Sequence, residues 1–233
     1  MNIKSYLFTY IFIFLVLLQR ILRIYMASSS TNSIQPQDYD YFLVLDFEAT
    51  CDDKTKLNQH EIIEFPVLKI NGRTFECEST FHAYVTPTLN PQLTEFCTKL
   101  TGITQDMVSN QPNLAAVLED FDIWLRKEDL LKKTVRFIFV TCGDWDLYTM
   151  LPGQCDYFHL PRAEYFNRWI NIKKSFNKVT RKYPRSGMVG MLGDLNIQHQ
   201  GRHHSGIDDC KNIAEILKAL ALRGHVFEEN RKK

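Results

Sequence analysis

The sequence predicts an α/β layer structure with a mixed sheet, and three observations support this prediction. The chain has 233 residues, of which 45% are hydrophobic, enough for one substantial core. Strand patterns come first, at residues 41–49, 61–70, 74–85 and 135–141. Helical patterns follow residue 90, near 91–99, 112–127, 145–151, 161–176, 187–195 and 207–222. Strands followed by strand-helix alternation favour helices layered on a mixed sheet.

The first strand pattern carries two acids, Asp46 and Glu48, inside an otherwise apolar run. Residues i and i+2 of a strand point to the same face, so both carboxylates are predicted to project together while Leu45 and Phe47 point the other way. Two neighbouring anions on a buried strand are costly. A divalent cation that prefers oxygen ligands, Mg²⁺ or Mn²⁺, would compensate. The alternative is that an acid at the end of a strand only caps a loop.

A strand pattern at 135–141 ends in Cys142 and Gly143, and a short helix is predicted to begin around Asp144. Asp144 has the position of an N-cap, and Asp146 lies inside the first turn. Spacing alone does not choose between the two as a third acid.

The last helix pattern, from residue 207, contains two adjacent aspartates that fall on different faces. Asp209 shares an apolar stripe with Ile213 and Ile216, whereas Asp208 lies on the polar side with Glu215. Asp208 is explained as a first-turn or capping acid. An acid at the head of a core-facing stripe needs a partner, so Asp209 is the predicted metal ligand.

Two histidines, His203 and His204, precede this helix and are separated from it by Gly206. A histidine on a loop beside a glycine fits a general base that approaches the metals. The alternative is an ordinary surface histidine.

Together these residues resemble the DEDDh 3′-to-5′ exonucleases, which carry D-x-E on the first strand, an Asp at a later strand-to-helix turn and H-x₄-D at a terminal helix. Over roughly residues 38–226 the chain is similar to the enhanced-RNAi, or histone-mRNA 3′-end, exonuclease branch. The strings that carry the resemblance are Asp46-Phe-Glu-Ala-Thr-Cys51, His60-Glu-Ile-Ile-Glu-Phe-Pro66, Leu93-Thr-Glu-Phe-Cys97, Leu100-Thr-Gly-Ile-Thr-Gln105, Trp145-Asp146, Trp169-Ile-Asn-Ile172, Gly201-Arg202 and Gly206-Ile-Asp-Asp209.

The resemblance implies a ribonuclease H-like fold, with a five-stranded mixed sheet and helices on both faces. It implies that Asp46, Glu48, Asp146 and Asp209 hold two Mg²⁺ ions about 4 Å apart, with Mn²⁺ as an alternative. His204, which unlike His203 has the required spacing to Asp209, would be the general base. The implied reaction removes nucleoside 5′-monophosphates from the 3′ end of single-stranded or 3′-overhang RNA.

An exonuclease must also hold a frayed 3′ end, and proteins hold single strands by stacking bases on aromatic rings. By their position in the family motifs, Phe96 and Trp145 are the expected base-stacking residues, and Leu100 and Thr101 are expected to line the pocket for the terminal nucleotide. The alternative for Phe96 and Leu100 is an i, i+4 helix pair that faces the core. The residues assigned to substrate binding by resemblance are Phe47, Ala49, Phe96, Leu100, Thr101 and Trp145.

The chain is nearly neutral, with a net charge of +1, so any attraction for nucleic acid must be local. The segment from Arg168 to Arg185 contains no acid and interleaves cations with aromatic residues. It is interpreted as a track for backbone phosphates, with a solvated surface as the alternative. The candidate cations of this track are Lys173, Lys174, Lys178, Arg181 and Lys182.

Two other functional classes remain open. One is a DNA-directed or dual nuclease of the same fold, and the other is a binding module with a vestigial site, which the complete acid and histidine set disfavours.

The chain departs from the family in two ways. No additional small nucleic-acid-binding domain is expected before the nuclease, which leaves stem-loop specificity open. His203 stands where the family often has proline, a change expected to leave the chemistry unaffected.

Residues 1–25 are hydrophobic, with no charge between Tyr6 and Leu18. This stretch is short for a membrane span and suits a signal-peptide core, but no good cleavage site follows it. The sequence after Met26 reads like an ordinary N-terminus, so translation from Met26 is expected to give an enzyme without stable membrane association. The longer form is then either a minor anchored isoform or a misassigned start, and membrane or secretory targeting by residues 1–25 stays open as the alternative.

The remaining boundaries are a flexible polar lead-in at 26–38, the exonuclease domain at 39–226 and a charged tail at 227–233. The six cysteines show neither C-x-x-C nor zinc-ligand spacing, and the chain has no N-glycosylation sequon. A reducing compartment, cytoplasmic and/or nuclear, is therefore expected.

Overall fold

A computed structural model describes residues 34–230 of the chain. The hydrophobic segment 1–25, the start at Met26, most of the predicted lead-in and residues 231–233 lie outside the described residues. Between residues 34 and 230 there is no helix whose length and apolar character would let it cross a membrane.

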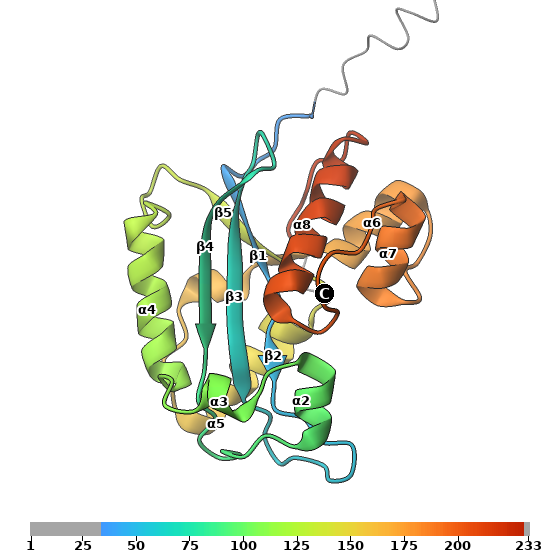
Figure 1. Cartoon of the computed structure of the whole chain (residues 1–233). Helices are drawn as coiled ribbons and strands as arrows, with labels where there is room; N and C mark the ends of the chain where they lie inside the picture. The colour runs from blue at the N-terminus through green and yellow to red at the C-terminus, as the bar shows by residue number, and fades with distance from the viewer. Residues whose placement is uncertain (1–33, 231–233) are drawn as a thin grey trace, which may run out of the picture. The chain divides into compact units, whose positions relative to one another are not determined.

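The sheet is mixed, as predicted, but it has six strands in the described residues instead of five (Figure 1). Its order is β2-β3-β1-β5-β6, and β4 pairs with β3. Strands β1, β5 and β6 run parallel to one another, and the pairings of β3 with β1, β2 and β4 are antiparallel. The strands are β1 (Tyr41–Leu45), β2 (Glu48–Ala49), β3 (Ile62–Asn71), β4 (Cys77–Tyr84), β5 (Phe137–Thr141) and β6 (Trp169–Asn171).

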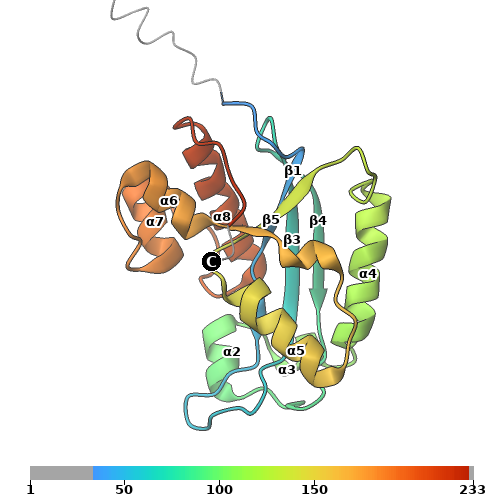
Figure 2. The same cartoon turned by 180° about the vertical axis from the view of Figure 1, so that it is seen from behind.

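Helices cover both faces of this sheet: α4 lies on one face, and α8 with α6 and α7 beside it lies on the other (Figures 1 and 2). The helical elements are α2 (Glu95–Thr101), α3 (Gln105–Val108), α4 (Leu114–Lys127), the π-helical turn η1 (Asp146–Met150), α5 (Leu151–Phe158), the 3₁₀ turn η2 (Glu164–Asn167), α6 (Ile172–Thr180), α7 (Gly187–Leu195) and α8 (Gly206–Ala221).

The face beneath α4 is packed with aromatic rings. Phe121 of α4 lies with its ring centroid 5.0 Å from that of Phe65 on β3 and 5.7 Å from that of Phe166. Leu45 and Phe47 belong to the same core, which confirms that both point to the face opposite the acids Asp46 and Glu48. Ring pairs at these separations add to the stabilisation that burial of their area provides.

The opposite face is covered by α8, which contacts β3 and β1. The stripe predicted from its sequence is buried, since Ile213, Ile216 and Leu220 are each 0% exposed. Asp209 lies at the head of this stripe and is 3% exposed, as the periodicity indicated.

The predicted strand at 41–49 is interrupted. Leu45 pairs opposite Val67 at the end of β1, and β2 resumes with Glu48 opposite Glu64. Between them the N–H of Phe47 donates to Asp146 Oδ1 at 3.0 Å. This side-chain acceptor takes the place of a ladder partner, so the strand divides there, and the division adds the sixth strand.

The prediction of one helix at 161–176 is wrong. This region contains η2, then β6, and α6 begins only at Ile172. Trp169–Asn171 pairs with Phe139–Thr141 of β5, so sheet pairing overrides the helical pattern. The Asn171 side chain then caps α6 by accepting from the N–H of Lys173 at 3.0 Å.

The described ends of the chain pack on the sheet and helices. Phe227 is fully buried, with its ring centroid 5.4 Å from that of Phe42. Its N–H donates to the Gln37 side chain at 3.0 Å. The N–H of Asn230 donates to the carbonyl of Trp169 at 3.1 Å. Parts of the predicted lead-in and tail therefore contact each other.

Candidate active site

Four acids that are far apart in the sequence come from four elements that meet at one end of β1. Asp46 lies in the break between β1 and β2, and Glu48 is the first residue of β2. Asp146 opens η1, and Asp209 lies in the first turn of α8. The structure therefore brings together the acids on which the metal prediction depends.

The imidazole of His204 joins this group. His204, Glu48 and Asp209 each offer a potential ligand atom, and these three atoms lie within 4.8 Å of one another. The His204 N–H donates to Asp209 Oδ2 at 3.0 Å. His204 has a positive φ of 64°, so its backbone turns sharply at the entrance to α8.

Burial raises the pKa values of all four carboxyl groups, and repulsion by neighbouring acids adds to the shift at Asp46 and Glu48. Desolvation is the largest cause in each case. The pKa of Asp46 is well above its ordinary range, and the negative charge of Asp146 is the next cause. The pKa of Glu48 rises to about 9 and that of Asp146 to about 6, while the pKa of Asp209 is also raised. Nearby positive charge would favour the ionised forms.

The donor set fits a hard divalent cation. Carboxylate oxygens are the ligands that Mg²⁺ and Mn²⁺ prefer, and a cation would offset the repulsion that helps to raise the pKa values of Asp46 and Glu48. Asp46 is partly exposed, so the cluster is open to solvent on one side. Glu48 and Asp146 are 8% and 5% exposed.

Two other aspartates that the sequence left as alternatives have partners elsewhere. Asp144 accepts from Trp169 Nε1 at 2.9 Å and pairs with Lys174 at 3.0 Å. Asp208 accepts from the N–H of Arg202 at 3.0 Å and pairs with Lys211 at 2.9 Å. Their pKa values are lowered, for Asp208 chiefly by the Arg202 N–H and for Asp144 by its side-chain hydrogen bonds against the opposing effect of burial.

A fifth carboxylate, Glu64, lies beside the four and was missed by the sequence reasoning. It is 1% exposed and accepts from the N–H groups of Gly206 and Ile207 at 2.9 and 3.2 Å. Its other partner is His82 Nε2 at 2.8 Å. Glu64 thus satisfies the free N–H groups at the start of α8. The available signal was a lone acid in the apolar run of β3.

Gly206 explains how closely α8 approaches the divided strand. A Cβ atom built on Gly206 would lie 2.7 Å from the carbonyl oxygen of Asp46 and 3.0 Å from Pro66 Cγ. No larger residue fits there without a shift of the helix. Gly206 and Glu64 together hold the start of α8, and with it Asp209, against the β1–β2 break.

The residues assigned to substrate binding lie in different environments. The Phe47 ring is buried 4.7 Å from the ring of Phe65, and only its N–H faces Asp146. Ala49 is 9% exposed. Thr101 is buried, and its hydroxyl donates to the carbonyl of Cys97 at 2.9 Å.

The two α2 residues that could stack or line a pocket are not core residues. Helix α2 buries Cys97 and Thr101, whereas Phe96 and Leu100 stay partly exposed. Trp145 precedes η1 and is 45% exposed, which leaves its ring available to a ligand. The core-pair interpretation of Phe96 and Leu100 is therefore weakened.

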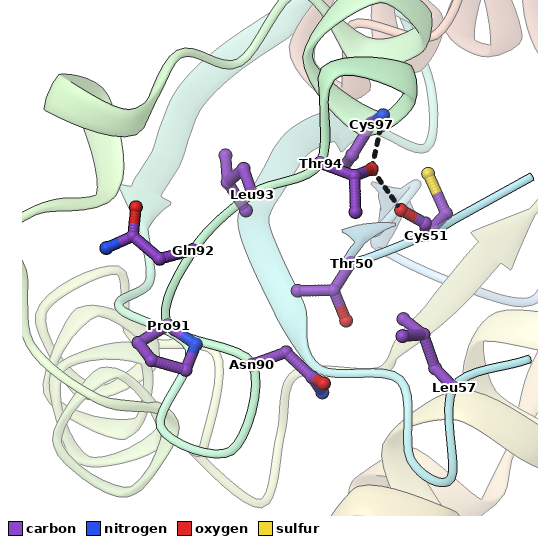
Figure 3. Close-up of a pocket in the computed structure, with 9 residues that line it drawn as sticks. All are labelled: Thr50, Cys51, Leu57, Asn90, Pro91, Gln92, Leu93, Thr94 and Cys97. Carbon is purple, nitrogen blue, oxygen red and sulfur yellow. Dashed lines mark hydrogen bonds between the residues drawn. The ribbon is translucent and has the colours of Figure 1, made fainter. Parts of the chain in front are cut away.

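A pocket of about 230 Å³ adjoins the end of β2, between Thr50 and the segment that leads into α2 (Figure 3). Thr94 spans it by donating to the Cys51 carbonyl at 2.7 Å and accepting from the Cys97 N–H at 3.0 Å. None of the residues predicted to bind substrate lines this pocket.

Three of the five predicted phosphate-track residues pair with acids outside the cluster. Lys174 pairs with Asp144, as described above, while Lys178 pairs with Glu228 and Lys182 with Asp194, each at 2.9 Å. Arg181 ends α6 in the left-handed conformation. Lys173 lies toward the acid cluster, where its charge lowers the pKa of Asp146. Its Nζ is 3.6 Å from the position of a Cβ on Gly143.

Comparison with known proteins places this arrangement in a family. Residues 43–217 match the profile of the exonuclease family RNase_T. ERI1 exoribonuclease 3 from Homo sapiens is 60% identical over 200 residues, which are 86% of this chain and 59% of the relative. 3′-5′ exoribonuclease 1 from Mus musculus is 41% identical over 197 residues, 83% of this chain and 56% of that protein. The chain thus spans less than two thirds of the length of these curated relatives.

Solved structures agree with this placement. The nuclease domain of 3′hExo bound to rAMP, a DEDDh family member, superposes with a TM-score of 0.80 and 38% identity, over 84% of this chain and 98% of that one. The 3′-exonuclease that recognises the histone mRNA stem-loop superposes with a TM-score of 0.81 and 35% identity, over 94% of this chain and 77% of that one. The fold is therefore ribonuclease H-like, and the chain belongs to the DEDDh exonuclease family, in the branch that includes ERI1 exoribonuclease 3 and 3′hExo.

Proposed function

We propose that this protein is a metal-dependent 3′-to-5′ exoribonuclease that releases nucleoside 5′-monophosphates from single-stranded or 3′-overhang RNA. The observation that carries the proposal is the convergence of four carboxylates, three of them buried and Asp46 partly exposed, with one imidazole, from segments that span more than 150 residues of the sequence. A binding module has no need to keep such costly groups together.

The relatives support RNA as the substrate. The curated relatives compared above are exoribonucleases, one related structure holds rAMP and another recognises a histone mRNA stem-loop. Because the chain spans only part of the curated relatives, their activity is proposed here and not carried over. Stem-loop recognition is left to experiment.

Asp46, Glu48, Asp146 and Asp209 would hold two divalent ions, Mg²⁺ or Mn²⁺. Such ions activate water and offset the charge that develops on a phosphate under attack. The raised pKa values of these acids support the assignment, because they indicate anions that lack a compensating charge. The protein's own contribution is to fix the donors, which Gly206 and Glu64 do at the start of α8.

His204 is the proposed general base. Burial and the neighbouring His203 lower its pKa, so the ring is neutral near pH 7 and can accept a proton from the attacking water. Its N–H bond to Asp209 fixes the loop on which it sits. This bond comes from the backbone of His204, and a ring nitrogen of the same residue lies within 4.8 Å of carboxylate oxygens of Glu48 and Asp209.

Trp145 and Phe96 are the proposed stacking surfaces for the terminal bases, with Leu100 beside Phe96 on α2. Their partial exposure supports this role. Phe47 and Ala49 would act through their backbone beside the acids, and Thr101 would shape α2 from within. Stacking tolerates any base, which suits an enzyme that removes nucleotides in succession.

Lys173 is the proposed phosphate contact closest to the reaction, because it lies toward Asp146 instead of pairing with a surface acid. Lys174, Lys178, Arg181 and Lys182 would guide the backbone farther from the cut. Their contacts would position the strand without reading its sequence.

The test is degradation of 5′-labelled RNA by the purified chain, with Mg²⁺ and with EDTA. The substrates are a single strand, a duplex with a 3′ overhang, a stem-loop, matched DNA, and RNA that lacks only the terminal 2′-hydroxyl. We expect a Mg²⁺-dependent ladder from the 3′ end of RNA and a lower rate without the terminal hydroxyl. Equal rates on DNA would establish the dual or DNA-directed alternative. No ladder on any substrate would refute the nuclease proposal.

A further inference from the structure

The loop between α7 and α8 holds a second group of ligand-type side chains, next to the acid cluster but of different chemistry. His199, His203 and Asp209 each offer one ligand atom, and these atoms lie within 4.8 Å of one another. We propose that these three residues bind a borderline transition-metal ion, with Zn²⁺ as the representative. Two imidazoles and one carboxylate form a zinc-type donor set, unlike the oxygen-rich cluster that suits Mg²⁺.

The separations fit one ion. Ligands of a tetrahedral Zn²⁺ at about 2.0–2.1 Å from the metal stand about 3.4 Å from each other. His203 Nδ1 is already 3.3 Å from Asp209 Oδ2 and 3.4 Å from Oδ1. His199 lies within the 4.8 Å limit, so a shift of its ring on the order of 1–2 Å would complete three corners. The fourth corner would be left for water.

His199 carries an unsatisfied polar atom. Its Nε2 is buried and has no hydrogen-bond partner among the described residues. A buried nitrogen without a partner has lost its contact with water and gained nothing in return. The ring of His199 stands edge-on to that of His203, with centroids 6.0 Å apart. A shared metal would give both rings a common partner.

The loop that carries the two histidines is held from both sides. The N–H of Gln200 donates to the Asn212 side chain at 2.9 Å, and Asn212 returns a hydrogen bond to the Gln200 carbonyl at 2.8 Å. Asp208 fixes the N–H of Arg202. Gly201 is required beside Asp208, because a Cβ there would lie 2.3 Å from the Asp208 carboxyl group. A loop fixed in this way loses little freedom when a metal binds.

The site shares Asp209 with the proposed catalytic cluster, and His203 stacks on His204 with ring centroids 3.9 Å apart. An ion on His199, His203 and Asp209 would engage the carboxylate that the proposed reaction needs and would restrain the neighbouring His204. Zn²⁺ is therefore expected to inhibit Mg²⁺-dependent turnover. This consequence rests on the proposed function, whereas the binding itself does not.

The experiment measures Zn²⁺ affinity of the full-length, metal-free chain by competition with a chromophoric chelator, without Mg²⁺ or RNA. His199→Gln and His203→Gln are expected to weaken binding at least tenfold. His225→Gln is the matched control, because His225 Nε2 is also buried without a partner but does not belong to the cluster. It should change the affinity less than twofold. Circular dichroism of each variant excludes loss of the fold.

Co²⁺ in place of Zn²⁺ gives a second readout. Visible absorption of the strength typical of four-coordinate cobalt should appear with the wild-type chain and disappear in both loop variants. In the RNA assay, each variant's own Mg²⁺ rate is the reference, and the Zn²⁺ concentration for half inhibition should rise at least tenfold in His199→Gln.

Two results would overturn the inference. One is wild-type Zn²⁺ affinity in both His199→Gln and His203→Gln. The other is loss of binding in His204→Gln with no effect of His199→Gln, which would place the ion in the carboxylate cluster with His204. A chain that binds Zn²⁺ as expected but degrades no RNA would refute the proposed function and leave this site standing.

Discussion

Two regions of this protein lie largely out of contact with solvent but differ in what burial does to them. Beneath α4, Phe65, Phe121 and Phe166 lie in ring-to-ring contact. At the end of β1, Asp46 and Glu48 lie among other carboxylates. The same stretch of chain serves both, because its alternate residues point to opposite faces. Burial stabilises the rings by about 1.5–3 kcal/mol each. Burial instead disfavours the ionised form of the acids, and bound cations would compensate for this cost.

Removing one acid should have the largest effect of the changes considered. It should lower turnover without reducing stability. Asp46→Asn is expected to lower turnover of RNA by at least about 10³-fold while the fold remains as stable as before or becomes more stable. Single-turnover rates and urea unfolding measure the two quantities. Asp120→Asn on the exposed side of α4 is the control. Residual activity within tenfold of wild type would remove Asp46 from the site.

Removing one ring should have the opposite pattern. Phe121 is fully buried, so Phe121→Ala is expected to lower the free energy of unfolding by about 3–5 kcal/mol. Turnover per folded molecule should stay within a few-fold of wild type at low temperature. Urea denaturation with an activity titration checks both. If the stability loss is below about 1 kcal/mol, the ring stack is not the main source of stability.

The acid cluster, unlike the aromatic rings, should make the stability of the chain depend on pH. Glu48 has a pKa of about 9 in the folded chain against an ordinary 4.5, so the folded state binds more protons between these values. Its stabilising contribution is complete below about pH 4.5 and is lost as the pH rises through about 9. We expect the melting temperature of the metal-free chain to fall from pH 5.5 to pH 8.5. Glu48→Gln should make this fall smaller, and in the presence of Mg²⁺ the melting temperature should rise over the same range. A melting temperature that is flat or rising over this window without metal would contradict it.

A surface ring should matter for substrate and not for stability. Trp145→Ala is expected to weaken binding of single-stranded RNA by about 1–3 kcal/mol, with little change in melting temperature. Fluorescence anisotropy with Ca²⁺ in place of Mg²⁺ measures the affinity without cleavage. Tyr157→Ala provides a matched control, since Tyr157 is 50% exposed and Trp145 45%. Equal effects of both changes would show that Trp145 is an ordinary surface ring.

The smallest expected effect compares two adjacent lysines. Lys173 lies toward Asp146, whereas Lys174 is paired with Asp144 at 3.0 Å. Lys173→Gln should reduce the salt dependence of RNA binding by about one phosphate contact, and Lys174→Gln should reduce it less. Binding isotherms at several salt concentrations test this. A larger effect at Lys174 would move the phosphate path toward the surface near Asp144 and Trp169.

The sequence predicted the helix faces and most strands because local periodicity reports burial directly. It separated Asp209 from Asp208 in this way. It could not separate Asp144 from Asp146, since the choice depends on which acid reaches the Phe47 N–H across 99 residues. The family resemblance supplied that choice.

The misses have the same cause. Trp169–Asn171 is a strand only because β5 lies beside it, and Glu64 matters only because α8 begins against it. The first relation leaves no local pattern, and the second leaves only a lone acid in an apolar strand, which does not say what that acid contacts. The predicted boundaries at residues 26, 38 and 226 and the cellular compartment remain predictions.

The hydrogen bond from the Phe47 N–H to Asp146 makes this one amide a probe of whether the acid cluster is formed. The Phe47 amide is protected from exchange with deuterium only while η1 is packed against the break between β1 and β2. Its exchange rate would therefore report, at one position and without any substrate, the fraction of molecules in which the third acid has joined the first two.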